Sequence, residues 1–481
     1  MTILLYNTIQ GIKSMLKRNI WQELIEWKNR EHHPLVIRGL RQIGKTFIAK
    51  EFGKQFYENV VYLDLRANTA VHKAFDGDFD VNQMILSITA VERTARFIPN
   101  RTLLILDEIQ DCPNARSSLK YWAIDGRFDV ICTGSFLGVK GFRTPYVRGV
   151  PVGYEEQVTM YPLTFGEFLL NTGMDKNVLQ YVKKSIEEKT AIEQTIHQST
   201  RQLYLQYLIV GGMPEVVNTF FETHDLNAVR DIQTQILNSI KDDFGRYKDA
   251  NGVEKVNEVL KLRAEACLNS LPAQLSKEYK KVQYSLVDVK GHSPEKADGL
   301  QYLEDVGLVV RSYNTKSLAY PLEAEKKATE FKVFYIDTGL LVSQLGLDVP
   351  AKILDGDLGP YKGAVAENMV ASAFSKTGRD LYYFRDATGS PELDFLFEKD
   401  GNTVIIECKA SNNRATSMKF VLSNPKRFGV HPAIKIADAN VGTTNDFDTL
   451  PLYSLGFIQQ EKKAHIVEMV DVANLKVPKP E

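Results

Sequence analysis

The chain has 481 residues, of which 44% are hydrophobic and 25% charged, a composition that fits a globular protein of about three ordinary domains. Its 59 Lys and Arg residues almost balance its 60 Asp and Glu residues, so any nucleic-acid or membrane partner would need a local charged patch. The four cysteines form no CxxC pair, and no apolar run reaches the ~18 residues of a membrane span. We therefore expect a cytoplasmic protein that has reduced thiols and makes no membrane contact.

An α/β domain is predicted over residues 31–175, after an N-terminal helix within residues 1–30. Its short apolar runs, "LVIRG", "VVYLDL", "TLLILDE", "DVICTGS" and "QVTMYPL", alternate with helical patterns. This alternation predicts a mostly parallel sheet that has helices on both faces. Residues 176–250 are helical and polar, with acidic and basic charges mixed, and we expect them to form a helical lid.

Residues 251–325 have the pattern of a winged-helix domain, in which a helix, a turn and a second helix precede the strand "LVVRSY". The second helix begins at Ser293 and Pro294 and would be the recognition helix of a DNA-binding domain. Its charged residues are Glu295, Asp298, Glu304, Asp305 and Lys296. The more basic segment before it contains Lys277, Lys280, Lys281 and Lys290. Because an acidic helix is unfavourable beside phosphates, DNA contact and a structural or protein-binding role both remain open.

A phosphate-binding motif follows the first predicted strand. The stretch "GLRQIGKT" fits G-x-x-x-x-G-K-[ST] and lies between the strand "LVIRG" and a helical pattern, which is the context that the motif requires. In such a loop the backbone N–H groups bind phosphates, Lys45 would reach the β- and γ-phosphates, and Thr46 would ligate Mg²⁺. The expected nucleotide contacts are Gly39, Leu40, Arg41, Gln42, Ile43, Gly44, Lys45, Thr46 and Phe47.

An acidic pair, Asp107 and Glu108, ends the apolar strand "TLLILDE". Asp107 would hold Mg²⁺ through water, and Glu108 would polarise the attacking water as a general base. Ser135 follows the next apolar strand, which ends in "CTGS". Its hydroxyl would touch the γ-phosphate or the water, or else would cap a helix or turn.

The sequence identifies no arginine finger. Arg143 and Arg148 follow the predicted sensor strand in "GFRTPYVRG" and would act in cis or from a neighbouring copy, or else lie solvated in a loop. Arg41 lies near the phosphates by its position in the loop, but a surface contact is equally open.

Several stretches resemble one family of prokaryotic ATPases. "IRGLRQIGKT", "LLILDEIQD", "CTGSFLG", "MYPLTFGEFL" and "VGGMPEVV" are similar to its AAA-type (ASCE-class) P-loop ATPase core. "DTGLL", "KGAVAENMV" and "ELDFLFEKDG" followed by "IIECKAS" are similar to its C-terminal, DUF4143-type region, which has a restriction-endonuclease-like core. The resemblance covers nearly the whole chain beyond about residue 15. It implies ATP binding, slow hydrolysis and a five-stranded core in which the Walker B strand lies next to the sensor strand.

Four C-terminal residues match the pattern of a PD-(D/E)xK nuclease site. Asp394 begins an apolar strand, and Glu407 and Lys409 lie two residues apart near the end of the next strand, so their side chains face the same side. Glu367 lies upstream in an apolar helical pattern. The carboxylates would hold Mg²⁺, and the lysine would orient or activate water. A nuclease-like fold that has lost catalysis is equally open, with Glu407 and Lys409 as a structural ion pair.

The sequence thus predicts an α/β protein with a P-loop NTPase sheet and helical lid, a winged-helix domain, and a PD-(D/E)xK-like domain over residues 326–475. ATP and Mg²⁺ are the expected cofactors. Two functions remain open. The first is an ATP-dependent enzyme that cleaves DNA through Asp394, Glu407 and Lys409. The second is a nucleotide switch whose C-terminal domains bind a protein or nucleic acid without cutting it. The oligomeric state and the physiological substrate are not predicted.

Overall fold

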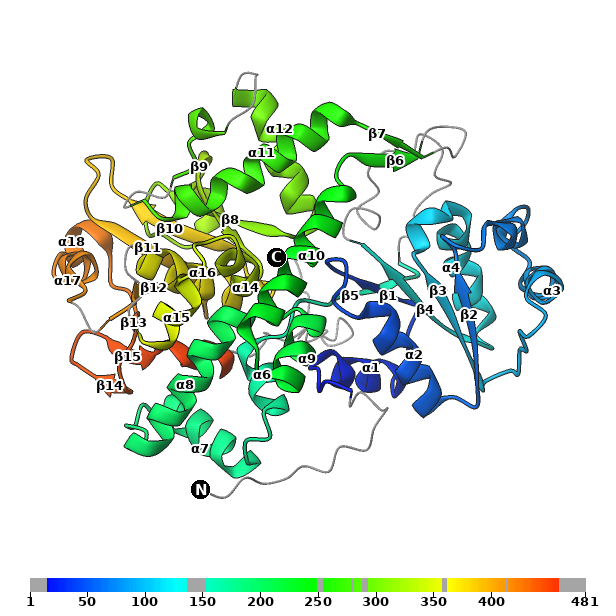
Figure 1. Cartoon of the computed structure of the whole chain (residues 1–481), viewed down its shortest axis with the longest axis horizontal. Helices are drawn as coiled ribbons and strands as arrows, with labels where there is room; N and C mark the ends of the chain where they lie inside the picture. Colours follow the sequence, from blue (N-terminus) through cyan, green and yellow to red (C-terminus); the bar gives the residue numbers. More distant parts are fainter. Residues whose placement is uncertain are drawn as a thin grey trace, which may run out of the picture.

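The computed structural model describes residues 15–135, 153–248, 254–277, 281–287, 293–356, 361–411 and 414–457. Within them two large sheets lie at opposite ends of the molecule, and helices α9 (Pro214–Thr223) and α10 (Leu226–Asp242) lie between them (Figure 1). None of the described helices combines the length and the hydropathy that a membrane span requires.

Five parallel strands form the first sheet, in the order β2-β3-β4-β1-β5. Their bounds are β1 Leu35–Arg38, β2 Asn59–Asp64, β3 Thr102–Asp107, β4 Asp129–Gly134 and β5 Glu156–Thr159. β3 is buried along its whole length, as expected for a parallel strand in a sheet that has helices on both faces. β4 pairs with both β1 and β3. The prediction that the Walker B strand, β3, lies beside the sensor strand, β4, is therefore confirmed.

Helices cover both faces of this first sheet. They are α1 Ile20–Lys28, α2 Lys45–Phe56, the 3₁₀ helix η1 Thr69–Phe75, α3 Val81–Val91, the 3₁₀ helix η2 Ile109–Asp111 and α4 Pro113–Asp125. α1 and α2 pack with Leu35 and Ile37 in one hydrophobic cluster, whereas α3 and α4 pack with Val36 in another. The two clusters exist because successive side chains of β1 point to opposite faces of the sheet.

A helical region follows the first sheet, as predicted. It contains α6 Phe165–Asn171, α7 Lys176–Glu187, α8 Gln194–Val210, α9 and α10. A two-stranded hairpin of β6 (Arg246–Lys248) and β7 (Glu254–Val256) comes next. The predicted lid boundary at residue 250 lies inside this hairpin.

Eight strands form the second sheet, in the order β14-β15-β13-β12-β11-β10-β8-β9. Their bounds are β8 Val309–Thr315, β9 Lys326–Tyr335, β10 Leu381–Arg385, β11 Glu392–Lys399, β12 Asn402–Lys409, β13 Ala433–Ala437, β14 Gly442–Thr443 and β15 Asp448–Pro451. β10, β11 and β12 are successively antiparallel, and β13 is parallel to β12. The helices after residue 338 are α14 Thr338–Ser343, α15 Val349–Leu354, α16 Lys362–Ser375, α17 Thr416–Leu422, α18 Pro425–Phe428 and the 3₁₀ helix η5 Leu452–Phe457.

The region predicted as a winged helix is joined to this second sheet. Its helices are α11 Glu258–Leu275, the 3₁₀ helix η3 Tyr284–Leu286, α12 Ser293–Val306 and α13 Leu322–Glu325. β8 contains all but the first residue of the predicted strand "LVVRSY". It pairs in parallel with β10, and β9 pairs antiparallel with β8. The predicted boundary between residues 325 and 326 thus separates two hydrogen-bonded strands of one sheet.

The regions also share a continuous core. One hydrophobic cluster contains Ile37 of the first sheet, Leu208 of α8 and Phe395 of the second sheet. Helix α8 contacts both α14 and α15. Buried apolar contacts therefore connect the P-loop region to the second sheet without a break, and a conformational change in one region can reach the other through packed side chains.

Candidate nucleotide site and a second charged cluster

The phosphate-binding loop runs from the end of β1 to the start of α2. Gly39 lies so close to the chain after β5 that a Cβ there would come within 2.2 Å of the Met160 carbonyl oxygen. Gly44 has a left-handed backbone, with φ of 87°, and directly precedes α2. The loop therefore delivers the backbone N–H groups of the first turn of α2 to one place, as a phosphate site requires.

Lys45 is buried at the start of α2. Its Nζ donates hydrogen bonds to the carbonyl oxygens of Gly39 at 3.1 Å and Leu40 at 2.9 Å. Burial lowers the pKa of Lys45 to about 8, although the nearby carboxylates of Glu108 and Asp107 work against that shift. The ammonium is thus poorly solvated, and bound phosphate charge would stabilise it.

The other predicted loop residues differ in what their side chains do. Those of Leu40 and Ile43 are buried in the core, so only their backbones could contact a phosphate. Phe47 is 49% exposed on α2. The Gln42 side chain donates to Ser239 Oγ at 3.1 Å, which directs it to α10.

Arg41 also contacts the end of α10. Its Nη1 donates to Asp243, the residue that follows that helix, and not to a group of the loop. Arg41 remains close enough to Lys45 to help lower the pKa of that lysine. The other two candidate arginines, Arg143 and Arg148, lie outside the described residues.

Asp107 accepts hydrogen bonds from three hydroxyl groups, which come from the start of α2, from β2 and from β4. Thr46 Oγ1 donates to Asp107 Oδ1 at 2.8 Å, and Tyr62 Oη donates to Asp107 Oδ2 at 2.7 Å. Thr133 Oγ1, on the adjacent strand β4, also donates to Asp107 Oδ1. The carboxylate is therefore fixed beside the loop threonine, where a divalent cation would be shared by the two residues.

Glu108 has a left-handed backbone, with φ of 54°, directly after β3. Its N–H donates to Thr133 Oγ1 at 3.3 Å, and its Oε2 accepts a hydrogen bond from Gln110 Nε2. Arg66 Nη2 lies 3.9 Å from the same Oε2. Arg66 also donates from Nε to Asp111 Oδ2 at 2.8 Å, so the guanidinium is fixed beside Glu108.

Sequence reasoning misses Thr133, Tyr62 and Arg66. Thr133 could have been found, because it lies near the carboxyl end of β4, beside β3, and carboxyl ends of parallel strands meet at one edge. The prediction names Ser135 instead, which is half-buried after β4, and its role stays a prediction. Tyr62 and Arg66 come from β2 and its following loop and carry no motif.

The four predicted C-terminal residues form a charged cluster, in which Glu367 and Glu407 are buried and Asp394 and Lys409 are half-buried. The pairing of Phe395 with Ile406 sets Asp394 beside Glu407 on adjacent antiparallel strands. The Cys408 N–H donates to Asp394 Oδ2 at 2.9 Å, and Lys409 Nζ lies 2.6 Å from Glu407 Oε1. Burial raises the pKa of Asp394, and the charges of Glu407 and Glu367 raise it further. Glu367, on α16, is therefore part of the same cluster.

A fifth residue, Lys332 of β9, joins this cluster and has no sequence signal. Its Nζ lies 2.7 Å from Glu392 Oε1, and its side chain is buried. Burial opposes its charge, but Glu367, Glu392 and Asp394 together raise its pKa. No group of three or more His, Cys, Asp or Glu side chains in the described ranges is placed to hold a metal ion. Two lysines supply the positive charge here, and the predicted ligand role of the carboxylates stays a prediction.

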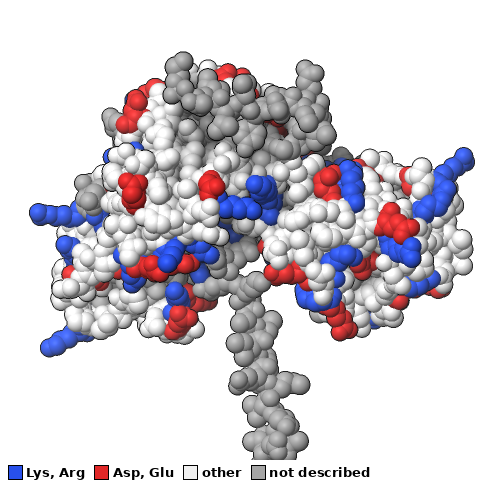
Figure 2. Space-filling model, turned by 90° about the horizontal axis from the view of Figure 1, so that it is seen from below, with Lys and Arg blue, Asp and Glu red and all other residues white. Residues whose placement is uncertain are grey.

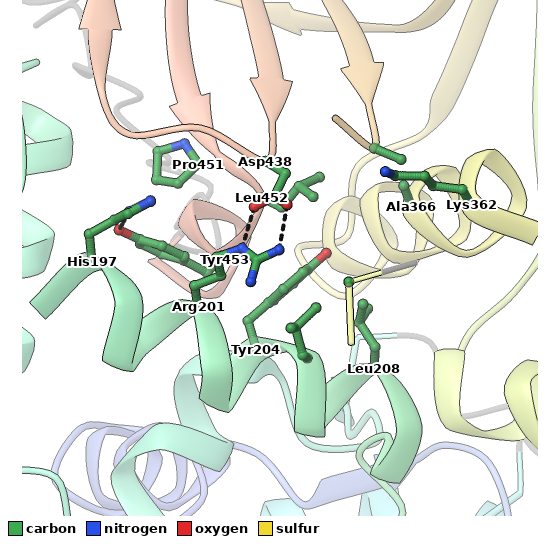
Figure 3. A pocket seen from close by; sticks show the side chains of 13 residues that line it. His197, Arg201, Tyr204, Leu208, Lys362, Ala366, Asp438, Pro451, Leu452 and Tyr453 are labelled. Carbon is green, nitrogen blue, oxygen red and sulfur yellow. Dashed lines mark hydrogen bonds and ion pairs between the residues drawn. The ribbon is translucent and has the colours of Figure 1, made fainter. Parts of the chain in front are cut away.

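A small cavity lies where α8 meets the carboxyl ends of β12, β13 and β15 (Figure 3). Arg201 of α8 donates from Nε and Nη2 to the two oxygens of Asp438, each at 2.6 Å. Near it, His197 Nδ1 lies 2.8 Å from Tyr453 Oη. The cavity volume of about 20 Å³ is enough for one water molecule and too small for a nucleotide. It lies at the contact between α8 and the second sheet.

Comparison with solved structures gives low similarity. The Aeropyrum pernix ORC2 protein in ADPNP–ADP complexes is 14% identical, with 75% of this chain and 97% of that chain covered and a TM-score of 0.32. Cdc6p from Pyrobaculum aerophilum is 12% identical, with 73% and 98% covered and a TM-score of 0.24. A RuvB variant from Thermotoga maritima is 13% identical, with 61% and 86% covered and a TM-score of 0.26. TM-scores this low do not establish a shared fold.

Comparison with protein families is more specific. A search of curated proteins finds no match. Residues 201–351 match a domain of unknown function, DUF8612, and residues 362–454 match a domain of unknown function, DUF4143. Residues 31–169 match the AAA domain family. Together with the phosphate-binding loop, Asp107 and the strand order of the first sheet, this match identifies residues 31–169 as an AAA-type P-loop domain of the ASCE class.

Proposed function

We propose that the chain binds ATP with Mg²⁺ in its AAA-type domain and hydrolyses it. The observation that carries this proposal is the 2.8 Å hydrogen bond between Thr46 Oγ1 and Asp107 Oδ1, because it joins the two groups that would share a magnesium ion. The loop also fits a phosphate group. Gly39 and Gly44 keep side chains out of it, and its buried lysine lacks a carboxylate at hydrogen-bond distance among the described residues.

Each residue would have a defined part in the reaction. Lys45 would contact the β- and γ-phosphates, and Thr46 and Asp107 would hold Mg²⁺. Mg²⁺ would supply charge that neutralises the phosphate oxygens. Glu108 would orient and deprotonate the attacking water, and Arg66, whose Nη2 lies 3.9 Å from Glu108 Oε2, would hold the carboxylate in position.

Nucleotide binding tests this proposal directly. We expect Lys45→Ala to weaken the binding of a fluorescent ADP at least tenfold, or by more than about 1.4 kcal/mol. The matched control is Lys54→Ala on the same helix, where the ammonium is exposed and pairs only with the neighbouring Glu51. Equal affinity of the Lys45→Ala variant and the wild-type chain would contradict the proposal.

For the C-terminal region we propose a module that binds a protein or nucleic acid without cutting it. The supporting observation is that Lys409 forms an ion pair with Glu407 and Lys332 with Glu392, so cations of the chain itself lie among the carboxylates. Cleavage of plasmid or single-stranded DNA in Mg²⁺ or Mn²⁺ that is lost in Lys409→Ala would overturn this proposal and support the nuclease hypothesis.

The candidate recognition helix, α12, also has little free positive charge. Lys296 Nζ donates to the carbonyl oxygens of Tyr284 at 3.1 Å and Val287 at 2.8 Å. Lys281, in the more basic segment, pairs with Glu330 at 3.3 Å. Figure 2 draws the molecule from below, the side opposite to α12 in Figure 1, and on that face basic and acidic side chains lie interspersed among the described residues. These contacts favour a protein-binding or structural role for this helix over DNA contact.

A further inference from the structure

Arg18 lies before α1 and links the P-loop to the segment after β5. Its Nη1 donates to the Ile43 carbonyl oxygen at 3.3 Å, and its Nη2 donates to the Tyr161 carbonyl oxygen at 2.6 Å. Its Nε donates to Glu167 Oε1 at 3.2 Å. The Arg18 side chain is 5% exposed. A buried guanidinium that donates to three separate groups fixes their relative positions, because moving any one of them breaks a charge-assisted hydrogen bond.

The segment after β5 is itself held firmly. The Met160 N–H donates to the Arg38 carbonyl oxygen at 2.8 Å, and the backbone of Met160 leaves no room for a side chain at Gly39. Glu167 and Thr164 form a reciprocal capping box at the start of α6. A shift of the P-loop therefore either moves this segment or breaks its contacts.

The same segment contacts the C-terminal region through Leu163. The Leu163 carbonyl oxygen accepts hydrogen bonds from Tyr207 Oη and, at 3.2 Å, from Lys376 Nζ. The Leu163 N–H donates to the Gly212 carbonyl oxygen at 2.7 Å, and the Gly212 N–H donates to Asp337 Oδ2 at 2.6 Å. The stretches "MYPLTFGEFL", "VGGMPEVV" and "DTGLL" thus meet at one buried point.

Lys376 is the residue directly after α16, the helix that carries Glu367 of the C-terminal cluster. It is 3% exposed and lies in a group of buried charges that includes Arg18, Glu167 and Asp337. Burying so many charges costs free energy that apolar side chains of similar size would not cost. This cost indicates that the buried charges have a role beyond packing.

We propose that Arg18 is a positioning residue for the P-loop, and that the network from Arg18 through Leu163 to Lys376 couples nucleotide binding to α16. This coupling rests on the proposed nucleotide binding. Phosphate bound by the loop would fix the backbone at Ile43, and the Arg18 contacts would carry that change to the segment after β5. The Leu163 carbonyl would then transmit it to Lys376 and the end of α16.

The test is hydrogen–deuterium exchange of the full chain with and without ADP. In the wild-type chain we expect ADP to change the exchange of peptides covering residues 362–375. In Lys376→Met, ADP affinity should stay within about threefold of wild type, while the ADP-dependent change in these peptides is lost. Tyr207→Phe removes the other side-chain donor to Leu163 with almost no change of volume, and it should reduce the same response even if Lys376→Met fails to fold.

Arg18 is tested by ADP affinity. We expect Arg18→Ala to bind ADP about tenfold more weakly and Arg18→Lys to recover part of that loss. The control Arg101→Ala, an exposed residue paired with Glu58, should leave both affinity and exchange unchanged. The coupling would be overturned if the ADP-dependent change of exchange in α16 persisted in both Lys376→Met and Tyr207→Phe. It would also be overturned if the wild-type chain bound ADP with no change of exchange in α16. A wild-type chain that binds no nucleotide would instead overturn the ATPase proposal, and the coupling with it.

Discussion

Thr46 Oγ1 and Asp107 Oδ1, which come from the start of α2 and the end of β3, are joined by a 2.8 Å hydrogen bond. β1 and β3 both lie next to β4 in the sheet, and the carboxyl ends of these three parallel strands lie at one edge. Thr46, which follows the loop after β1, therefore comes close to Asp107 at the end of β3. Thr133 of β4 completes the arrangement by donating to the same oxygen of Asp107. The sheet order therefore places the proposed magnesium ligands together before any ligand is bound.

Thr133→Ala should lower the rate of ATP hydrolysis while leaving ADP affinity nearly unchanged. The Thr133 hydroxyl orients Asp107 and accepts from the Glu108 N–H at 3.3 Å, so its loss disturbs both acidic groups. We expect kcat to fall about tenfold or more, which corresponds to about 1.4 kcal/mol. Steady-state kinetics would check this, and an unchanged kcat would show that the hydroxyl has no part in turnover.

Arg66→Ala should lower kcat with little effect on KM. Arg66 lies 3.9 Å from Glu108 Oε2 and is fixed by Asp111, so it acts on the proposed base and not on the nucleotide. We expect a fall of about tenfold in kcat. Arg127, which pairs with Asp125 away from this site, provides the matched control. A change confined to KM would place Arg66 at the nucleotide instead.

Lys376→Met should change how stability depends on pH. Burial lowers the pKa of Lys376 from its ordinary value of 10.5 to about 8. Between these values the unfolded chain binds more protons than the folded chain, so the free energy of unfolding rises with pH from about 8 to 10.5. The buried charge of Lys376 therefore lowers the free energy of unfolding below pH 8 by on the order of 3 kcal/mol, relative to its value above pH 10.5.

The Lys376→Met variant has no charge at this position and so lacks this destabilisation. We expect it to be more stable than wild type below pH 8, with the difference shrinking as pH rises towards 10.5. Urea unfolding at several pH values would measure this, and Lys45, whose pKa is also lowered, contributes equally to both chains. If the free energy of unfolding changed with pH in the same way in both chains, the lowered pKa of Lys376 would be contradicted.

Gly212→Ala should destabilise the folded chain by about 2 kcal/mol. A Cβ at Gly212 would lie 2.1 Å from the Leu163 carbonyl oxygen, so the backbone contact between the two segments would have to open. Gly442→Ala is the control, because a Cβ there meets no atom within 4 Å. Thermal unfolding of the two variants should differ by several degrees, whereas equal midpoints would argue against the close contact.

The main residues of the candidate nucleotide site could be picked out from the sequence because they lie in short contiguous motifs that end or follow strands, and their role in nucleotide binding stays a prediction. Lys45, Thr46, Asp107 and Glu108 all follow this rule. Tyr62 and Arg66 escape prediction because they reach the site only through the pairing of β2 with β3. Pairing between strands is a long-range property that a local pattern does not contain.

The C-terminal cluster shows the opposite case. Glu367, Asp394, Glu407 and Lys409 lie together in the structure, but Lys332 joins them from β9, a strand of the same predicted domain that carries no motif. The same holds for Arg18 and Lys376, whose burial beside Glu167 and Asp337 depends on packing between distant segments. The sequence shows which charged residues are present, but it does not show which residues of opposite charge lie next to them in the fold.

Phosphate release by the Glu108→Gln variant is the sharpest test of the proposed Mg²⁺-dependent ATP hydrolysis by the AAA-type domain. The substitution keeps the shape of the side chain and removes the proposed base. We predict that this variant binds ATP as tightly as wild type and releases phosphate at least a hundredfold more slowly. Phosphate release at the wild-type rate by Glu108→Gln, or no Mg²⁺-dependent release by the wild-type chain, would contradict the account.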